Sequence, residues 1–419
     1  MTTIPHYMMD VTLKIRPGAL AANAAILLDV VKTAAKDGMK EVLLPIDALR
    51  GGDCGSLNDH PAFQEAIAAA QKKFLKAVAK IKKAPEIRYV EPLCRLTPVE
   101  GPGPDPRFPF GGRPEEVFPR QVLALATRLS AIGCKNAVIG LSGGLDSALA
   151  LLVTVRAFEL LGLDRAGIHV FTMPGFGTTK RTRGNADLLA EGLGLKMETI
   201  NITPACRQHF KDIGQSERNH DVTFENAQAR ERTQILMDKA NQVNGIVVGT
   251  GDMSEIALGW STYNGDHMSM FGVNAGVPKT VVREVCRWWA EGSDCPKAAK
   301  ALLDIIDTPV SPELLPAKHG QIAQKTEDHV GPYELHDFFL WHFIAENEGR
   351  AAILRAAKKS FRGAYDAATI TKWLDVFFRR FFSQAFKRNC APDGAQVFSV
   401  WLAPSGWHVP SDISGSAFV

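Results

Sequence analysis

The sequence lacks a long uninterrupted apolar segment. In its longest apolar helical stretch, residues 148–163, Arg156 and Glu159 break the hydrophobic run, whereas a membrane-spanning helix needs about 20 consecutive apolar residues. The first residues also lack the basic segment followed by an apolar stretch that marks a secretory signal. We therefore expect neither a membrane span nor secretion.

An excess of charge of one sign is missing as well. Lysine and arginine total 48, aspartate and glutamate total 45, and the net charge is +3. Because non-specific binding to nucleic acid depends on a strongly basic surface, we expect no nucleic-acid partner. The seven cysteines are scattered, odd in number and without a CxxC or Cys/His metal spacing. They predict a reducing, cytoplasmic location rather than a disulfide framework or a zinc site.

The sequence does have enough apolar residues for a large core, since 46% of its 419 residues are hydrophobic. Residues 101–114 include five prolines and four glycines, a composition that sustains neither a helix nor a central strand. We therefore expect a small domain at residues 1–95, a linker at 96–114 and a main domain at 115–419.

The main domain alternates strand-like and helix-like patterns. Apolar segments of strand length lie at 137–141, 167–173 and 245–249, and helical patterns lie at 119–132, 147–161, 184–193 and 226–241. This alternation predicts an α/β fold with a doubly wound parallel sheet, whose ligands bind at the carboxyl ends of the strands. The segment from residue 332 onward is helical and aromatic, and we expect it to cap the sheet.

The small domain shows the same kind of alternation in a shorter form. Residues 11–15 and 41–45 read as strands, with helix-compatible residues 20–35 between them and a second helix at 61–84. That second helix carries six lysines between residues 72 and 83, and the one aromatic residue among them, Phe74, shares the apolar face with Val78 and Ile81. We interpret the lysines as a solvated helix face rather than an anion or nucleic-acid site.

The most informative segment is 137–150, which reads as strand AVIGL, turn SGGLDS and helix ALALL. Gly143 and Gly144 allow the backbone to approach an oxyanion, and the helix that begins near Ser147 directs its positive end at the same place. No lysine follows the glycines, so the loop is not a Walker A motif; Asp146 is suited to Mg²⁺ instead. The alternative is a glycine-rich turn in which Asp146 and Ser147 only cap the helix.

The SGGLDS turn resembles the signature of the PP-loop ATP pyrophosphatases, which cleave ATP between the α and β phosphates. Further segments, in family order, resemble NAD synthetases, particularly the synthetase half of the glutamine-dependent enzymes. These segments are TMPGFGTT (172–179), ENAQAR (225–230), VVGTGDMSEIALGWSTY (247–263), NAGVPK (274–279), the tail QKTEDHVGPYELHDFFLWHF and then FKR (386–388). The resemblance covers about three quarters of the chain, from roughly residue 115 to the end.

The resemblance implies a set of site residues. ATP would contact Gly140, Ser142, Gly143, Gly144, Asp146, Ser147, Met173, Thr250 and Lys279. Deamido-NAD would contact Asn226, Arg230, Glu255, Trp260, Ser261, Thr262, Tyr263 and Lys387. Mg²⁺ would bind Asp146 and Glu255, and the catalytic residues would be Asp146, Lys279 and Asp266. Simpler interpretations remain open: an ion pair between Arg230 and Glu255, a solvated Lys387 and a turn role for Asp266.

The implied activity is that of a ligase in NAD biosynthesis. Deamido-NAD would be adenylated by ATP and then attacked by ammonia, which yields NAD, AMP and pyrophosphate. The resemblance also implies a homodimer or a higher homo-oligomer. A PP-loop enzyme that modifies tRNA would need a basic surface and often catalytic cysteines, which this composition does not offer.

The N-terminal segment resembles the first βαβ unit of the nitrilase-like glutaminase that supplies ammonia to large NAD synthetases. It departs from that pattern, because Ile46 follows Pro45 where the family has a catalytic glutamate, and Asp47 comes one residue late, where strand alternation would direct it to the other face. The chain then reaches the linker after one more helix, which leaves no room for the middle of a nitrilase fold. The two local cysteines, Cys54 and Cys94, lack the base and lysine that would activate a thiol.

We therefore expect a degenerate remnant without glutaminase activity, and a synthetase that uses free ammonia. Two alternatives remain open. A separate glutaminase subunit could dock on the remnant and deliver ammonia. The chain could also be a non-catalytic NAD-sensing scaffold, although a retired site has no physical reason to keep costly buried charges.

Overall fold

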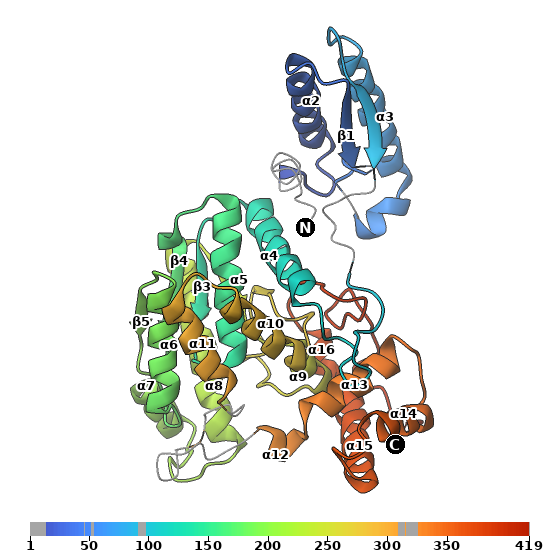
Figure 1. Ribbon diagram of the computed structural model, residues 1–419. Coiled ribbons are helices and arrows are strands. Elements are labelled where there is room, and N and C mark those ends of the chain that lie inside the picture. The colour runs from blue at the N-terminus through green and yellow to red at the C-terminus, as the bar shows by residue number, and fades with distance from the viewer. Residues whose placement is uncertain are drawn as a thin grey trace. The chain divides into compact units, whose positions relative to one another are not determined.

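A computed structural model describes residues 14–45, 47–51, 54–90, 98–308, 315 and 326–418. The chain divides into two compact units (Figure 1). The small unit comprises Met1–Thr97 with Thr127–Gly133, and the large unit comprises Pro98–Ala126 with Cys134–Val419. Each unit is described by itself.

The small unit is built on two parallel strands. Its elements are α2 (Leu20–Lys36), β1 (Glu41–Pro45), a 3₁₀ turn (Gly55–Asp59), α3 (Pro61–Val78) and β2 (Glu86–Val90). The core consists mainly of aliphatic residues of α2 and β1 together with Phe74 of α3. Buried Asn23 of α2 donates hydrogen bonds to the carbonyl oxygens of Arg16 (2.8 Å) and Leu49 (3.1 Å). It thereby links the segment before α2 to the turn after β1.

The predictions for the small unit hold in part. The strand at 41–45 and the helix at 20–35 are confirmed, but the helix expected at 61–84 ends at Val78 because the chain must turn back to pair β2 with β1. In the strand expected at 11–15, residues 11–13 lie outside the described residues and Ile15 is not in a strand. Asp47 lies in a turn after β1, so strand alternation does not determine its direction, and it pairs with Arg50.

The large unit contains the predicted doubly wound sheet. Five parallel strands have the order β5-β4-β3-β6-β7 and are β3 (Ala137–Gly140), β4 (Ile168–Thr172), β5 (Met197–Thr199), β6 (Ile246–Gly249) and β7 (Phe271–Gly272). The chain runs outward from β3 to β5 and then returns to β6 on the other side of β3. This reversal creates a switch point at the carboxyl ends of β3 and β6, where open α/β sheets bind ligands.

Two groups of helices pack on this sheet (Figure 1). One group contains α5 (Leu145–Leu161), α6 (Lys180–Gly192), α10 (Lys279–Glu291) and α11 (Pro296–Ile306), which pack against one another. The second contains α7 (Thr203–Asp212) and α8 (Val222–Val243), and α8 covers β3 and β6. Helix α5 buries twelve of its 17 residues, which explains its apolar sequence. No helix among the described residues is long and apolar enough to cross a membrane.

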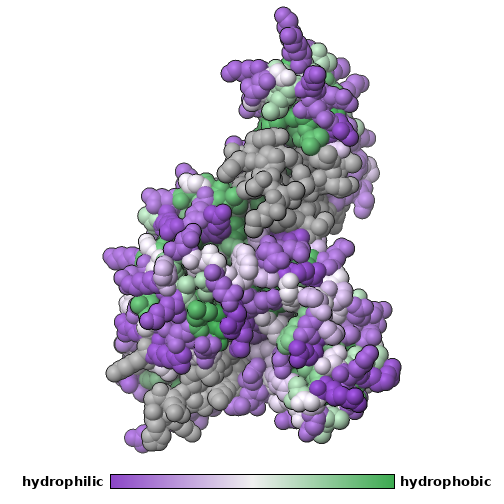
Figure 2. Space-filling view, viewed as in Figure 1, coloured by the Kyte–Doolittle hydropathy of each residue, from purple (hydrophilic) through white to green (hydrophobic). Residues whose placement is uncertain are grey.

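The segment after residue 326 forms a helical group that packs on α9 (Met253–Leu258) and α10. Its helices are α12 (Thr326–Val330), α13 (Tyr333–Ile344), α14 (Arg350–Ser360), α15 (Ala367–Ser383) and α16 (Ala385–Asn389). Its aromatic side chains fill the group's own core; Phe343, for example, contacts Phe378 and Phe381 edge to face. Most of these aromatic side chains are buried. The surface of the large unit that Figure 2 shows is mostly hydrophilic.

The proline- and glycine-rich segment packs within the large unit. The Val99 amide donates to the Val397 carbonyl oxygen at 2.8 Å, and the Phe110 ring is buried against Trp341 and Phe398. Helix α4 (Pro114–Ile132) follows and begins five residues before the predicted 119, with Pro119 inside it. Pro119 is the sixth residue of this helix, so it lacks the amide that would donate an intrahelical hydrogen bond to the carbonyl oxygen of Glu115, and the helix continues past this missing bond.

Candidate active site

The SGGLDS segment forms a tight loop between β3 and α5. Gly143 has φ +84°, and a Cβ atom there would lie 2.0 Å from the Thr182 carbonyl oxygen, so only glycine fits. Ser147 Oγ accepts from the Ser142 amide (3.2 Å) and donates to the Gly144 carbonyl oxygen (3.0 Å), which fixes the loop. Gly144 is the N-cap of α5 and no side chain caps the helix. The helix start therefore keeps its positive end available for an anion.

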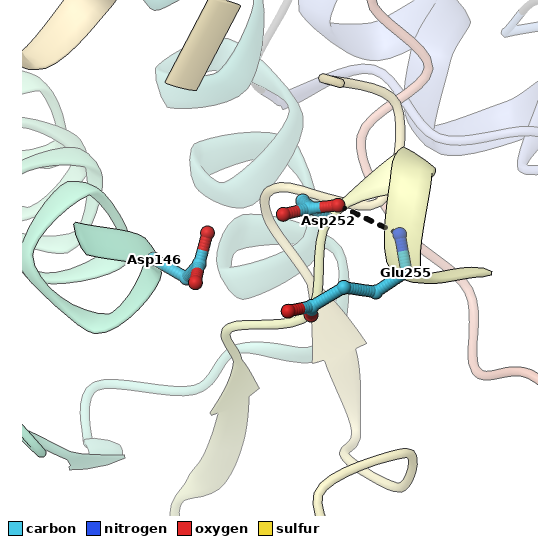
Figure 3. Close-up of side chains that lie close together, drawn as sticks. All are labelled: Asp146, Asp252 and Glu255. Carbon is cyan, nitrogen blue, oxygen red and sulfur yellow. Dashed lines mark hydrogen bonds between the residues drawn. The ribbon is translucent and has the colours of Figure 1, made fainter. Parts of the chain in front are cut away.

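Three carboxylates converge beside this loop (Figure 3). Asp146 comes from the first turn of α5, Asp252 is the N-cap of α9, and Glu255 lies in the first turn of α9. One oxygen of each lies within 4.8 Å of the other two. The Asp252 Oδ1 atom accepts the Glu255 amide hydrogen bond at 2.9 Å, drawn as a dashed line in Figure 3, and so fixes its own side chain.

Lys279, the first residue of α10, inserts its ammonium group between the three carboxylates. Its Nζ atom lies 2.6 Å from Asp146 Oδ2, 2.6 Å from Asp252 Oδ2 and 3.0 Å from Glu255 Oε1. The Tyr333 ring centroid lies 5.4 Å from Nζ. The lysine and Asp252 are almost completely buried, whereas the side chains of Asp146 and Glu255 remain 21% and 20% exposed.

Burial and mutual repulsion control the charges of this cluster. Burial raises the pKa of Glu255 to about 7 and that of Asp252 well above its usual value, and Lys279 only partly offsets this effect. Burial alone would lower the pKa of Lys279, but the three carboxylates outweigh it and raise that pKa. Asp146 Oδ1 is buried and has no hydrogen-bond partner among the described residues. An all-oxygen donor set with an orphaned carboxylate oxygen fits a hard divalent cation.

Buried hydrogen bonds hold this cluster in place. The Lys279 amide donates to Ser254 Oγ at 2.8 Å, and Ser254 in turn donates to Asp337 of α13. The Thr280 amide (3.0 Å) and hydroxyl (2.7 Å) also donate to Asp337, and burial raises the pKa of that carboxyl to about 6. The carboxylate at the start of α10 also complements the helix dipole. The position of Lys279 is thus fixed from behind by α13.

Asn274 connects the carboxyl ends of the two central strands. Its Nδ2 group donates to the carbonyl oxygens of Asp146 (2.9 Å) and Thr250 (3.0 Å), and its Oδ1 accepts from Gln121 Nε2 (2.9 Å). The side chain is completely buried. One amide therefore links the loop after β3 to the segment after β6, the two sides of the switch point.

A second group of predicted residues lies where α8 meets the segment after α9. Asn226 Oδ1 accepts from the Thr262 hydroxyl at 2.7 Å, and Arg230 Nε donates to the Tyr263 carbonyl oxygen at 3.2 Å. Arg230 therefore contacts this segment and Glu255 contacts Lys279, so the alternative ion pair between Arg230 and Glu255 does not describe this structure.

Asp266 and Lys387 line one pocket together with Glu255 and Ser261. Asp266 is exposed at the wall of this pocket, and its Oδ1 accepts from the Thr262 amide at 2.9 Å. The surrounding protein displaces water from the carboxylate, and this desolvation raises the pKa of Asp266. Lys387 Nζ donates to the carbonyl oxygens of Gly259 (2.9 Å) and Ser261 (2.7 Å). Burial, assisted by Arg380, lowers the pKa of Lys387, so this lysine is not a freely solvated charge.

The family model described as NAD synthase matches residues 117–372, which include the loop, the three carboxylates and Lys279. The chain is 41% identical over 325 residues to the glutamine-dependent NAD(+) synthetase of Mycobacterium tuberculosis, a match that covers 71% of this chain and 48% of that protein. The chain belongs to the NAD synthase family.

This NAD synthase family member is also similar to two further known proteins. It is 33% identical over 243 residues to the glutamine-dependent NAD(+) synthetase of Thermotoga maritima, covering 57% of this chain and 39% of that protein. The solved glutamine-dependent NAD(+) synthetase from Cytophaga hutchinsonii has the same fold, with a TM-score of 0.60 at 19% identity over 73% of this chain and 55% of that one. The chain spans about half the length of the relatives it matches.

Three further predicted residues of this family member contact groups other than the three carboxylates. Gly140 ends β3, and a Cβ atom there would lie 3.1 Å from Leu236 Cδ1 and 3.3 Å from Met173 Cε, which is a tight contact. The Met173 carbonyl oxygen accepts from Arg232 Nε at 3.1 Å. Trp260 stacks on His329 at a centroid distance of 6.3 Å.

Sequence reasoning missed Asp252, Ser254, Asn274 and Asp337. Three of them lie inside segments that resemble NAD synthetases, at GTGDMSE and NAGVPK, and Asp337 lies in the tail motif. The one available signal was therefore their position within those segments, because a helix cap, a serine and an amide carry no chemical signature of their own.

Proposed function

We propose that this chain makes NAD from deamido-NAD, ATP and ammonia and releases AMP and pyrophosphate. The observation that carries the proposal is the placement of Lys279 and three carboxylates beside an open, glycine-rich helix start in a member of the NAD synthase family. A nicotinate carboxylate is a negative and poor electrophile, so its reaction with an α-phosphate needs concentrated positive charge.

The first step is adenylation. A carboxylate oxygen of deamido-NAD attacks the α-phosphorus of ATP, and the bond to pyrophosphate breaks. The amides of Gly143 and Gly144 and the start of α5 bind phosphate, and Lys279 stabilises the charge that develops on it. Gly140, Ser142, Ser147, Thr250 and the backbone around Met173 complete the proposed ATP site.

Asp146 and Glu255 would hold Mg²⁺, because both carboxylates reach the solvent side of the cluster and Asp146 Oδ1 lacks a partner among the described residues. When bound, Mg²⁺ supplies positive charge at the phosphates.

The proposed deamido-NAD site lies along α8 and the segment 260–263. Asn226 and Arg230 already contact Thr262 and Tyr263, which supports a shared surface. Lys387 fixes that segment through its two carbonyl contacts and thereby orients Trp260 and Ser261.

The second step is amide formation. Ammonia attacks the acyl carbon, the bond to AMP breaks, and the nitrogen loses a proton. Asp266 is the proposed acceptor that binds ammonium and takes its proton, since a carboxyl with a raised pKa in a pocket shared with Glu255 suits this task.

Free ammonia is the proposed nitrogen donor. In the small unit, Cys54 Sγ donates to the Arg50 carbonyl oxygen and Asp47 pairs with Arg50, while the support for ammonia comes from the sequence, in which Ile46 stands where the glutaminase family has its catalytic glutamate. Ile46 and Cys94 lie outside the described residues. On the grounds of family resemblance, we also propose a cytoplasmic homodimer or higher homo-oligomer, with residues 1–95 as a remnant domain.

The test is to incubate the purified chain with deamido-NAD, ATP and Mg²⁺, with either ammonium or glutamine, and to detect NAD, AMP and pyrophosphate. Ammonium should support NAD formation and glutamine should not. NAD formation from glutamine would reveal a compact glutaminase. Activity with glutamine only after a separate glutaminase is added would favour a docked partner, and no AMP with either donor would favour a scaffold.

A further inference from the structure

The four charged groups of the cluster divide into an inner pair and an outer pair. Lys279 and Asp252 form the inner pair, with side-chain exposures of 4% and 0%. Asp146 and Glu255 form the outer pair, with exposures of 21% and 20%. A cation that arrives with nucleotide from solvent therefore meets the outer carboxylates first.

Lys279 contacts its inner partner, Asp252, and both outer carboxylates at the same time. Its Nζ atom lies within 3.0 Å of one oxygen of each outer carboxylate. A magnesium ion binds oxygen at about 2.1 Å, so an ion held by Glu255 and by Asp146 Oδ1, the oxygen without a hydrogen-bond partner among the described residues, would share both carboxylates with the ammonium group. The two cations repel each other at so short a distance, so the lysine needs another counter-ion when the metal binds.

Asp252 has the geometry of that counter-ion. Its Oδ1 atom is fixed as the cap of α9, which holds Oδ2 at 2.6 Å from Nζ. The Lys279 amide donates to Ser254 Oγ, which fixes the backbone of the lysine. Rotation about the side-chain bonds alone can therefore move the ammonium group away from the outer carboxylates and toward Asp252.

We propose that Asp252 is a positioning residue that retains Lys279 when Asp146 and Glu255 take the metal. It acts through the lysine and is not itself a metal ligand. This inference rests on the proposed function in taking the outer pair as the metal site. Without Asp252, the ammonium group would stay on the outer carboxylates and exclude the metal.

The test is a double-variant cycle with Mn²⁺ as the probe, measured by electron paramagnetic resonance without nucleotide. Asp252→Asn in the full chain should weaken Mn²⁺ binding by about tenfold or more, the order found when a supporting partner of a metal ligand is removed. Lys279→Met should strengthen Mn²⁺ binding, because the competing cation is gone. Adding Asp252→Asn to Lys279→Met should then change the affinity by less than about twofold, since Asp252 acts only through the lysine.

Two results would overturn the proposal. A similar loss from Asp252→Asn in both backgrounds would make Asp252 a direct ligand, and no loss in the wild-type background would leave it without this role. If Lys279→Met alone leaves a buried carboxylate unpaired and fails to fold, the double variant, which removes both inner charges together, is compared with the wild type: it should bind Mn²⁺ at least as tightly, and weaker binding would make Asp252 a direct ligand. The cycle requires no turnover, so it can succeed even if the chain makes no NAD.

Discussion

The two units both contain parallel strands connected by helices, but they differ in the charged side chains that they bury. Among the described residues of the small unit, Asn23 is the one fully buried polar side chain, and it only ties backbone groups together. The large unit buries Lys279, Asp252 and Asp337. Burying charge is costly unless it is paired. These buried charged side chains thus lie where the chemistry is proposed. The small unit has the buried residues expected of a structural module.

Sheet size explains part of this difference. Two parallel strands, β1 and β2, offer two carboxyl ends, and the turn after β1 closes on itself through Asp47 and Arg50. Five strands create a switch point at the carboxyl ends of the paired strands β3 and β6, and α9 and α10 supply side chains to it from other parts of the sequence. A site with several converging charges requires the larger sheet.

The strongest test of this contrast compares one aspartate from each unit. Asp146→Asn should reduce AMP formation by at least about 10²-fold, because it removes an electrostatic contact to the reacting phosphate. Asp47→Asn should leave AMP formation unchanged, since its ion pair with Arg50 is partly exposed and worth at most about 1 kcal/mol. Rates of AMP release at saturating substrates give the comparison, and circular dichroism confirms folding.

Near-normal turnover by a folded Asp146→Asn protein would contradict the metal assignment. A comparable loss from Asp47→Asn would instead give the small unit a direct part in catalysis.

The next effect concerns Asp266. Asp266→Asn keeps an oxygen that can accept the Thr262 amide hydrogen bond but removes the charge. We expect a loss of about 10²-fold at neutral pH and low ammonium, with partial recovery as pH rises and more ammonia is unprotonated. The measurement is the pH profile of kcat/KM for ammonium. A loss of equal size at every pH would support the turn interpretation and remove the ammonium role.

The sequence predicted the fold best where burial is complete. Strands β3, β4 and β6 were found within one or two residues, because their apolar runs are fully buried in a parallel sheet. Strands β5 and β7 have three and two residues and no apolar run, so pairing with a neighbour defines them rather than their own sequence. Helix α6 begins at Lys180, four residues before the predicted start, because Thr179 caps it.

The candidate site was predictable as a set of residues but not as an arrangement. Asp146 and Lys279 are 133 residues apart in the chain, and only the fold shows that their charged groups lie at 2.6 Å. Asp252 escaped prediction because an aspartate just before a helix indicates an N-cap, and it is one; its second oxygen has the further contact with Lys279. The sequence around an aspartate can indicate its hydrogen bond to the adjacent helix, but it does not indicate a second contact with a residue far along the chain.

A smaller effect distinguishes the stability of the two units. Burial lowers the pKa of His336 in the large unit to about 4, below the ordinary value of about 6.5 in an unfolded chain. Between these values the unfolded state binds more protons, so stability falls as pH falls. The contribution of His336 to this loss from pH 7 to pH 5 should be about 2 kcal/mol, whereas Glu255 and Asp337, whose pKa values burial raises, act in the opposite direction over the same range.

Tryptophan fluorescence isolates this effect, because all seven tryptophans lie at residue 260 or later, in the large unit. Urea unfolding at the two pH values measures the change in stability of each protein, and the change from pH 7 to pH 5 should be more favourable in His336→Gln than in the wild type by about 2 kcal/mol. His60→Gln, in the small unit, is the matched control and should behave like the wild type. An unchanged pH dependence in His336→Gln would assign the acid sensitivity to other groups.

The smallest expected effect is at Cys54, the described cysteine of the small unit. Its thiol is partly buried and donates a long contact of 3.8 Å to the Arg50 carbonyl oxygen, which a serine hydroxyl can also make. A glutaminase would depend on its thiolate almost completely, because nucleophile, base and lysine contribute as a unit. We therefore expect Cys54→Ser to change ammonium-dependent NAD formation by less than about twofold and to leave glutamine unused. The same assay on Cys134→Ser, a partly buried thiol of the large unit that lies outside the proposed site, gives the baseline for substituting a thiol with no catalytic task. If Cys54→Ser instead abolished NAD formation from glutamine in a wild type that had it, the contrast between the two units would fail, and the small unit would contain a working nucleophile.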